Sequence, residues 1–331
     1  MKEIDRLIGK EKSMVEKYMQ KLIDRNKDPF EVYGLVWEFL SRGGKRIRPV
    51  FCLLCTEAVG GKREDALPAA VCIELFHNFT LIHDDIEDNS KMRRGEPCLH
   101  ISHGLPIAIN AGDGLFMMAW KAVLELDVVP KVQLEVQRRL HHAFTMVLEG
   151  QAVELRWHRD KIWDIGEDDY LEMVKGKTGA LIAGSCEVGS IIGGGSGGQT
   201  EGLYEFGMKI GMAFQIQDDI LNITGSEKIY GKEIGGDIRE GKRTLMVLHA
   251  LNKASPGERR KMIEILDSCK GDKESVSWVV KIMKKYRSIE YAKRVETRMI
   301  EDAYKKLSLI RDCPAKRKLI RLAEYLVKRK I

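Results

Sequence analysis

The stretch Leu67 to Asp88, LPAAVCIELFHNFTLIHDDIED, places an acidic group at the end of an apolar helix. Apolar residues recur at helical spacing as far as Ile82, and the acidic residues follow at once. On a helix, Asp84 and Asp88 lie about 40° apart on one face. Carboxylates spaced in this way repel each other and oppose the helix dipole at a C-terminus. The pattern therefore predicts a bound cation, and Mg²⁺ suits carboxylate oxygens best.

A second acidic group repeats this arrangement further along the chain. Phe214 to Asn222, FQIQDDILN, is predicted to lie on a helix that begins near Leu203. Gln215, Asp218 and Asn222 are spaced to share one face of that helix. A single acidic group could be an ordinary charged turn. Two such helices facing each other would enclose metal ions inside a bundle, so the metal site is the better interpretation.

The remaining sequence predicts an all-α fold in one domain, residues 1–331. Helical spacing of apolar residues occurs almost throughout, without the alternation or Asn-Gly turns typical of strands. No polar linker and no repeat divides the 331 residues, of which 44% are hydrophobic. Gly193 to Gly198, GGGSGG, is predicted to be a flexible loop between two helices. Seven prolines stand where helices are expected to begin or end: Pro29, Pro49, Pro68, Pro106, Pro130, Pro256 and Pro314.

Composition limits the compartment and the partners. The formal net charge of +6 is too small to indicate nucleic acid, and no recognisable nucleic-acid module is present. Seven cysteines give no disulfide framework, and Cys52 and Cys55 are predicted to be buried. The N-terminus lacks the apolar core of a signal peptide, so we expect a cytoplasmic protein. The basic stretch Lys316 to Lys330 is predicted to be an amphipathic helix with a solvated face, and membrane contact is peripheral at most.

Four basic segments are interleaved with the acidic groups. They are GGKRIRP (Gly43 to Pro49), MRRG (Met92 to Gly95), KGKTG (Lys175 to Gly179) and KEIGGDIREGKRT (Lys232 to Thr244). Mg²⁺ commonly shares its coordination shell with phosphate oxygens, and cations beside glycines suit the same ligand. The combination predicts a diphosphate site. A nucleotide-binding phosphate loop is excluded, because Arg243 and not Ser or Thr follows Lys242.

At these motifs, from GGKRIRP to GKRT, the sequence resembles the trans-isoprenyl diphosphate synthase family. The resemblance implies an orthogonal bundle of long helices around a central cavity, of the isoprenoid synthase type, and a homodimer. It also implies Mg²⁺ as the cofactor, roughly three ions in each active site. Isopentenyl diphosphate and an allylic diphosphate would be the substrates.

The same resemblance assigns roles to residues at matching motif positions. Metal binding would fall to Asp84, Asp85, Asp88, Asp218 and Asp219. Contacts to the allylic diphosphate would come from Arg93, Lys177, Lys232 and Lys242, and contacts to isopentenyl diphosphate from Lys45, Arg48, His77 and Arg94. Thr178 and Gln215 would present oxygens to the allylic cation, with Gln151 nearby. Asn222 stands where many members have Asp, which leaves its contact to metal open, although an amide oxygen can also ligate.

The implied reaction is a head-to-tail (1'-4) condensation. Metal ions and cations would stabilise the departing diphosphate, the allylic fragment would become cationic, and the double bond of isopentenyl diphosphate would attack it. A proton would then leave, and the departing diphosphate would accept it. No protein nucleophile is needed.

Bulky residues upstream of Asp84 would set the product length. The candidates are Phe79 and Phe76, with small Thr80 between Phe79 and the acidic group. On an ideal helix Phe79 lies about 140° from Asp84, so helix geometry alone does not make it the block. The resemblance favours a C20 product, geranylgeranyl diphosphate, with the C15 farnesyl diphosphate second.

Two other functions remain open from the sequence. A class I terpene cyclase would share the metal chemistry but would not need GGKRIRP or the paired arginines Arg93 and Arg94. A catalytically inert helical subunit that regulates a partner synthase would need no metal ligands, so the intact acidic groups argue against it.

Overall fold

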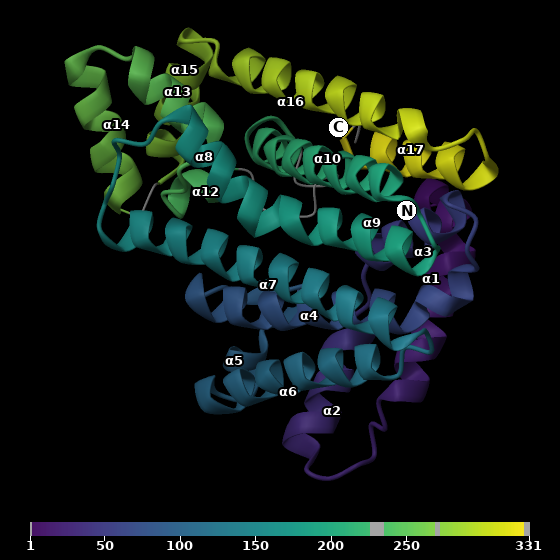
Figure 1. Cartoon of the computed structure of the whole chain (residues 1–331). Helices are drawn as coiled ribbons and strands as arrows, with labels where there is room; N and C mark the ends of the chain where they lie inside the picture. Colours follow the sequence, from purple (N-terminus) through teal and green to yellow (C-terminus); the bar gives the residue numbers. More distant parts are fainter. Residues whose placement is uncertain (1, 226–234, 269–271, 328–331) are drawn as a thin grey trace. The chain divides into compact units, whose positions relative to one another are not determined.

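The structure is a computed structural model that describes residues 2–225, 235–268 and 272–327 (Figure 1). Two compact units make up the chain. Unit 1 comprises Met1–His142, Gly184–Tyr204 and Leu309–Leu322, and unit 2 comprises Ala143–Ala183, Glu205–Ser308 and Ala323–Ile331. Nearly all regular structure in the described residues is helical, which confirms the all-α prediction.

Helix α4 of unit 1, Leu67–Glu87, follows the helical spacing of its apolar residues. It packs against α1, α3 and α6, and Figure 1 shows α4 and α6 side by side. Every residue from Ala69 to Phe76 is buried, as expected for a helix that is apolar on all sides. The elements of unit 1 are α1 (Lys2–Leu22), α2 (Phe30–Ser41), α3 (Ile47–Ala58), η1 (Arg63–Ala66), α4, β1 (Met92–Arg93), β2 (Glu96–Pro97), α5 (Leu99–Ser102) and α6 (Leu105–Leu124).

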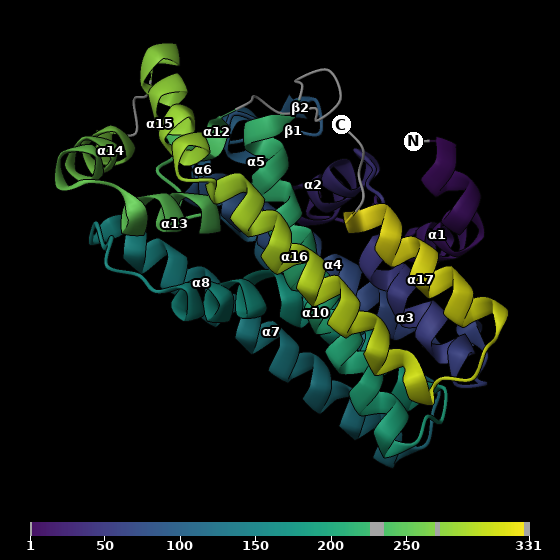
Figure 2. The ribbon, with the colours of Figure 1, turned by 90° about the horizontal axis from the view of Figure 1, so that it is seen from above.

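Unit 2 has its own apolar core, which includes Trp163, Tyr170, Ile220 and Met262. Figure 2 shows α15 leading into α16, with α13 beside the junction, and all three helices are in contact. The elements of unit 2 are α8 (Glu167–Val174), the π-helical turn η2 (Lys175–Gly179), α12 (Gly236–Arg239), α13 (Leu245–Lys253), α14 (Pro256–Ser268), α15 (Lys273–Lys285) and α16 (Ser288–Lys305). Five elements contribute residues to both units: α7 (Pro130–Arg159), α9 (Ala180–Ile192), α10 (Gly197–Thr224), η3 (Lys306–Leu309) and α17 (Pro314–Val327).

The predicted helix boundaries agree with the structure at the prolines and differ at the glycines. Pro130, Pro256 and Pro314 are the first residues of their helices, and the other four predicted prolines lie at or within the first turn. The second acidic helix begins at Gly197 and not near Leu203, so the predicted loop 193–198 is shorter than expected. Glycine has a low helix propensity, which is why the sequence alone placed this start too late.

Two helical segments in the described residues are long and strongly apolar. Segment Arg63–Glu87 and helix α6 are long and apolar enough to cross a membrane by length and composition alone. Most of the apolar window in Arg63–Glu87 is buried inside the protein, and buried core helices pass the same test.

Cys52 and Cys55 are fully buried in α3, as predicted. The basic C-terminal helix predicted for residues 316–330 is α17 as far as Val327, and residues 328–331 lie outside the described part.

Candidate active site

The end of α4 holds its three aspartates in different environments. Asp85 is 1% exposed, and its Oδ1 accepts a hydrogen bond from Arg93 Nε at 2.7 Å and lies 2.5 Å from Arg93 Nη2. The Asp84 side chain is 24% exposed, with Oδ2 at 3.5 Å from Arg93, and Asp88 is exposed at the end of the helix. Asp85 is thus the carboxylate that anchors Arg93, and Asp84 and Asp88 are the two nearer to solvent.

A short hairpin carries Arg93 and Arg94 to this helix end. Strand β1 pairs with β2 in antiparallel register, Met92 opposite Pro97 and Arg93 opposite Glu96. The turn residues Arg94 and Gly95 both have positive φ, 57° and 85°. Two positive φ values are the requirement of a tight hairpin turn, and Gly95 meets it without strain. The sequence predicts no strand here, because a hairpin of two-residue strands without Asn-Gly is too short for alternation of apolar residues to reveal.

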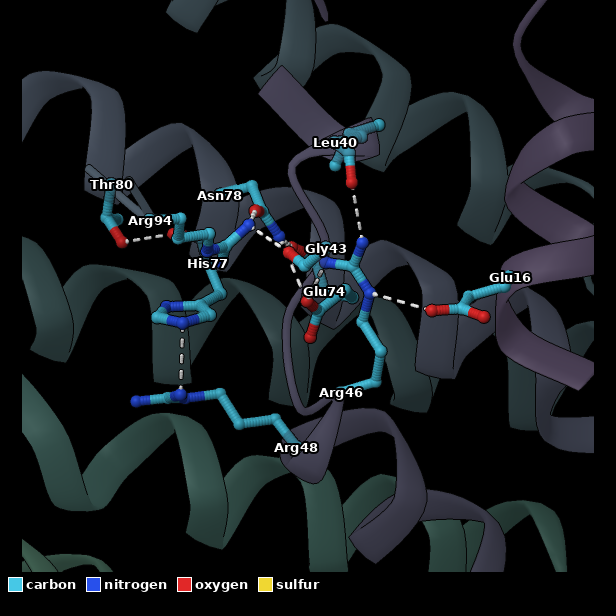
Figure 3. A network of polar contacts seen from close by, with 10 residues as sticks. All are labelled: Glu16, Leu40, Gly43, Arg46, Arg48, Glu74, His77, Asn78, Thr80 and Arg94. Carbon is cyan, nitrogen blue, oxygen red and sulfur yellow. Dashed lines mark hydrogen bonds and ion pairs between the residues drawn. The ribbon is translucent and has the colours of Figure 1, made fainter. Parts of the chain in front are cut away.

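Cations and one histidine gather beside α4 in unit 1 (Figure 3). His77 Nε2 lies 3.2 Å from Arg48 Nη1. Because a guanidinium can only donate, His77 Nε2 accepts here and the ring is neutral. Burial, followed by the nearby arginines Arg48 and Arg94, holds the pKa of His77 well below its usual value. The ring therefore stays neutral at ordinary pH and supplies an Nδ1 donor.

The guanidinium groups next to His77 crowd one another. Arg94 donates to the Gly43 carbonyl and, at 3.3 Å, to Asn78 Oδ1. Burial and the charge of Arg46 lower the pKa of Arg94 to about 10. Burial also lowers the pKa of Arg48. Clustered cations whose pKa values are lowered favour an anionic ligand, which would relieve their mutual repulsion. Lys45, on the same segment, is exposed.

Arg46 is the cation of GGKRIRP that the fold uses internally. It is 4% exposed, and it donates to Glu74 Oε1 and to the Leu40 carbonyl, both at 2.8 Å. Glu74 also accepts from Asn78 Nδ2 at 3.0 Å (Figure 3). This buried network fixes the segment between α2 and α3, which carries Lys45 and leads directly into the first turn of α3, where Arg48 lies. The sequence assigned Lys45 and Arg48, but not Arg46, to isopentenyl diphosphate, and the structure gives Arg46 a separate role inside the fold.

In unit 2, a chain of hydrogen bonds links the second acidic group to η2. Tyr170 donates from its hydroxyl to Asp219 Oδ2 at 2.9 Å, and Gln215 Nε2 donates to Asp219 Oδ1 at 2.8 Å. Thr178 donates to Gln215 Oε1 at 2.9 Å. Burial, and then the charge of Asp237, raise the pKa of Asp219 to about 8. Asp218, by contrast, is half-buried.

The π-helical turn η2 presents Lys177 and Thr178. A Cβ at Gly150 of α7 would collide with the backbone nitrogen of Lys177, so only glycine allows α7 to approach this turn so closely. π-Helical turns inside helices are frequent at functional sites. Lys177 Nζ forms an ion pair with Glu154, also on α7. Gln151, which the sequence placed near the site, follows Gly150 on the same helix.

Lys242, which follows the short helix α12, lies close to acidic side chains. Lys242 Nζ lies 2.8 Å from Glu240 Oε2 and 3.4 Å from Asp237 Oδ1. Asn222 Oδ1 accepts from the Asp237 backbone N–H at 3.1 Å. The Asn222 side-chain oxygen is therefore engaged by the backbone at the start of α12. Lys232, the other lysine predicted in this segment, lies outside the described residues.

An aromatic cluster lies next to the first acidic group. The ring centroid of Phe79 is 5.5 Å from Phe76, 5.3 Å from Phe116 and 4.7 Å from His83. Phe116 of α6 also meets Phe76, at 6.2 Å, and Trp120, at 6.4 Å. Thr80 donates to the His77 carbonyl at 2.8 Å. Phe116 and Trp120 were not among the predicted residues, although their spacing of four positions is the spacing that places two side chains on one face of a helix.

The donor chemistry of both acidic groups fits Mg²⁺. All of the candidate ligands are carboxylate oxygens, which hard divalent cations such as Mg²⁺ prefer. The buried Asp219 beside Asp237, with its raised pKa, is a site where negative charge lacks compensation. Within residues 2–225, 235–268 and 272–327, no three His, Cys, Asp or Glu side chains already converge as a metal-binding group.

Comparison with known proteins agrees with the fold and the motifs. The polyprenyl synthetase family model matches residues 31–283. A short chain isoprenyl diphosphate synthase of Methanothermobacter thermautotrophicus is 40% identical over 290 residues, 88% of each chain. A geranylgeranyl diphosphate synthase of Methanosarcina mazei is 37% identical over 301 residues, 91% of this chain and 90% of that protein. The crystal structure of a geranylgeranyl pyrophosphate synthetase from Pyrococcus horikoshii matches with a TM-score of 0.93 at 37% identity, covering 99% of this chain and 98% of that one.

These matches define an all-α prenyltransferase with the isoprenoid synthase fold. The chain belongs to the polyprenyl synthetase family.

Proposed function

We propose that the protein condenses isopentenyl diphosphate with an allylic diphosphate and makes geranylgeranyl diphosphate, the C20 product. The observation that carries this proposal is the half-buried group of Arg48, Arg94 and neutral His77 beside the acidic end of α4. Such a group suits a substrate whose diphosphate is bound but does not leave during the reaction. It lies next to a place where metal ions bind the diphosphate of a second substrate. A class I terpene cyclase, which binds one diphosphate, would have no use for it.

Asp84, Asp88, Asp218 and Asp219 would hold Mg²⁺, roughly three ions per active site. When bound, Mg²⁺ neutralises charge on the departing diphosphate. The contact of Asn222 Oδ1 with the Asp237 N–H favours a supporting role for Asn222 over metal ligation.

The protein's own residues would bind and orient the two substrates. Lys45, Arg48, His77 and Arg94 would hold isopentenyl diphosphate, and Arg93, Lys177, Lys232 and Lys242 would hold the allylic diphosphate. The anchoring of Arg93 by Asp85 supports this division, because it fixes one donor beside Asp84. Gln215 Oε1 and the Thr178 hydroxyl oxygen would face the allylic cation, and the departing diphosphate would accept the proton that is finally lost.

We further propose that residues 1–331 act as one isoprenyl diphosphate synthase domain in a cytoplasmic homodimer. Nucleic acid is not an expected partner, and membrane contact is peripheral at most. Light scattering of the purified protein checks the dimer directly.

The decisive experiment is a product assay. Purified protein with Mg²⁺ and isopentenyl diphosphate is given dimethylallyl, geranyl or farnesyl diphosphate, and the products are identified by chain length after dephosphorylation. We expect linear C20 alcohol, and we expect none after EDTA removes the metal. Accumulation at C15 would assign a farnesyl diphosphate synthase, and cyclic products would assign a cyclase. If none of the three primers is condensed with isopentenyl diphosphate, the enzymatic proposal is overturned and the inert subunit is favoured.

Product length provides a second prediction. Phe79→Ala removes a ring that packs between Phe76, Phe116 and His83, and the space it opens lets the growing chain extend. We expect the main product to lengthen by about one five-carbon unit, since large-to-small substitutions in packed sites leave a cavity. Phe30→Ala is the matched control, because Phe30 is 57% exposed. An unchanged product from both variants would show that Phe79 does not limit the chain.

A further inference from the structure

Tyr170 places its hydroxyl group deep inside unit 2. Its side chain is 1% exposed and lies in the apolar core with Trp163 and Ile220. A buried tyrosine hydroxyl is costly unless it has a hydrogen-bond partner, and Asp219 Oδ2 at 2.9 Å is that partner. The family resemblance assigned no role to Tyr170. The contact joins α8 to the acidic helix α10.

The hydrogen bonds of Asp219 determine how the Gln215 amide is turned. Both oxygens of Asp219 accept hydrogen bonds, so the Gln215 atom at 2.8 Å from Oδ1 is the amide nitrogen. The amide oxygen then points to Thr178, whose hydroxyl donates to it at 2.9 Å. The direction of the whole chain is set at its buried end, where Tyr170 donates to Oδ2.

We propose that Tyr170 is a positioning residue for prenyl transfer: by holding Asp219, it keeps the Gln215 amide oxygen and the Thr178 hydroxyl oxygen oriented toward the allylic cation. This inference rests on the function proposed above. It identifies the residue that fixes the orientation of the Gln215 amide, whereas the resemblance assigned a role only to the oxygens of Gln215 and Thr178.

Loss of the Tyr170 hydroxyl releases one oxygen of a buried carboxylate. Asp219 then turns toward another donor or cation, and its bond to Gln215 Nε2 weakens. The amide can reverse, which brings Nε2, with its partial positive charge, to the position of Oε1. A positive group there opposes a developing carbocation and leaves a neutral ligand almost unaffected.

The test uses Tyr170→Phe, which removes only the hydroxyl oxygen. We expect kcat to fall about tenfold, as for other residues that orient groups in direct contact with the reaction. The KM for isopentenyl diphosphate should change less than about twofold, because none of the residues proposed to hold it belongs to the hydrogen-bond chain from Tyr170 to Thr178. Tyr291→Phe is the matched control in unit 2, since its hydroxyl hydrogen-bonds to Glu167.

A binding measurement separates positioning from a general loss of structure. Calorimetry compares an ammonium analogue of the allylic cation, given with inorganic diphosphate and Mg²⁺, with an unreactive allylic thiolodiphosphate and Mg²⁺, whose prenyl group carries no charge. Tyr170→Phe should weaken binding of the ammonium analogue about tenfold and leave binding of the thiolodiphosphate within about twofold. Equal weakening of both would overturn the proposal, as would wild-type behaviour toward both.

The Gln215→Ala background tests the proposed route. Because Tyr170 is inferred to act through Gln215, adding Tyr170→Phe to Gln215→Ala should lower kcat by less than about twofold. A full tenfold further loss would show another route and overturn the inference. Gln215→Ala alone must also lose the ammonium analogue, which keeps the proposal testable if Tyr170→Phe does not fold. An inactive wild type contradicts the proposed function, whereas an active wild type with an unaffected Tyr170→Phe contradicts this inference alone.

Discussion

We expect Asp84→Asn to lower kcat/KM for condensation by about 10³-fold, and Asp218→Asn to do the same. Each substitution keeps the shape of the side chain and removes the negative charge that Mg²⁺ requires. Without a correctly held metal, the departing diphosphate keeps its charge, and ionisation of the allylic substrate becomes rate-limiting. Steady-state kinetics at a series of Mg²⁺ concentrations measure the loss, and higher Mg²⁺ should restore part of it.

Asp85→Asn should behave differently, although Asp85 is the immediate neighbour of Asp84. Asp85 is buried and paired with Arg93, so its loss frees Arg93. The KM for the allylic diphosphate should rise about 10-fold to 100-fold, and added Mg²⁺ should not restore it. Asp302→Asn is the control, because Asp302 is exposed on α16 and pairs only locally with Lys305 at 2.7 Å in the described contacts. Wild-type kinetics in Asp84→Asn would refute its place at the metal.

Helix α4 was predictable because its apolar residues repeat with the helical period over some six turns. The acidic residues at its C-terminal end were recognisable because their negative charges are unfavourable next to the negative end of the helix dipole. The start of α10 was misplaced because its first residues are Gly197 and Gly198, which carry no apolar pattern and have a low helix propensity. The β1–β2 hairpin was missed because two residues per strand leave no alternation to detect.

The partners of the site residues could not be predicted, because they are far away along the chain. Tyr170 and Asp219 are separated by 49 positions, and Arg46 and Glu74 by 28. Periodicity describes one helix at a time and says nothing about which side chain of another helix meets it. The motifs therefore gave the candidates for chemistry, and only the fold distinguished Asp85, which anchors Arg93, from Asp84, which is more exposed.

Arg46→Ala should lower the free energy of unfolding by about 3–5 kcal/mol, because it leaves Glu74 as an uncompensated charge in the core. Arg46 has a positive φ of 52°, which is unfavourable for arginine, and its bonds to Glu74 and the Leu40 carbonyl hold it there. The same loss should raise the KM for isopentenyl diphosphate, since Arg46 fixes the segment that carries Lys45 and Arg48. Denaturant unfolding and substrate kinetics measure the two effects.

Two further variants separate a buried charge pair from ordinary surface charge. Arg46→Met combined with Glu74→Met removes both charges and should recover much of the stability, because an apolar pair can replace a buried ion pair. Arg317→Ala is the control: Arg317 pairs with Asp312 at 2.6 Å, but both side chains are more than half exposed, at 57% and 74%. Its loss should cost less than about 1 kcal/mol. Equal destabilisation by Arg46→Ala and Arg317→Ala would mean that the Arg46–Glu74 pair does not hold the GGKRIRP segment. The backbone alone would then determine the position of that segment.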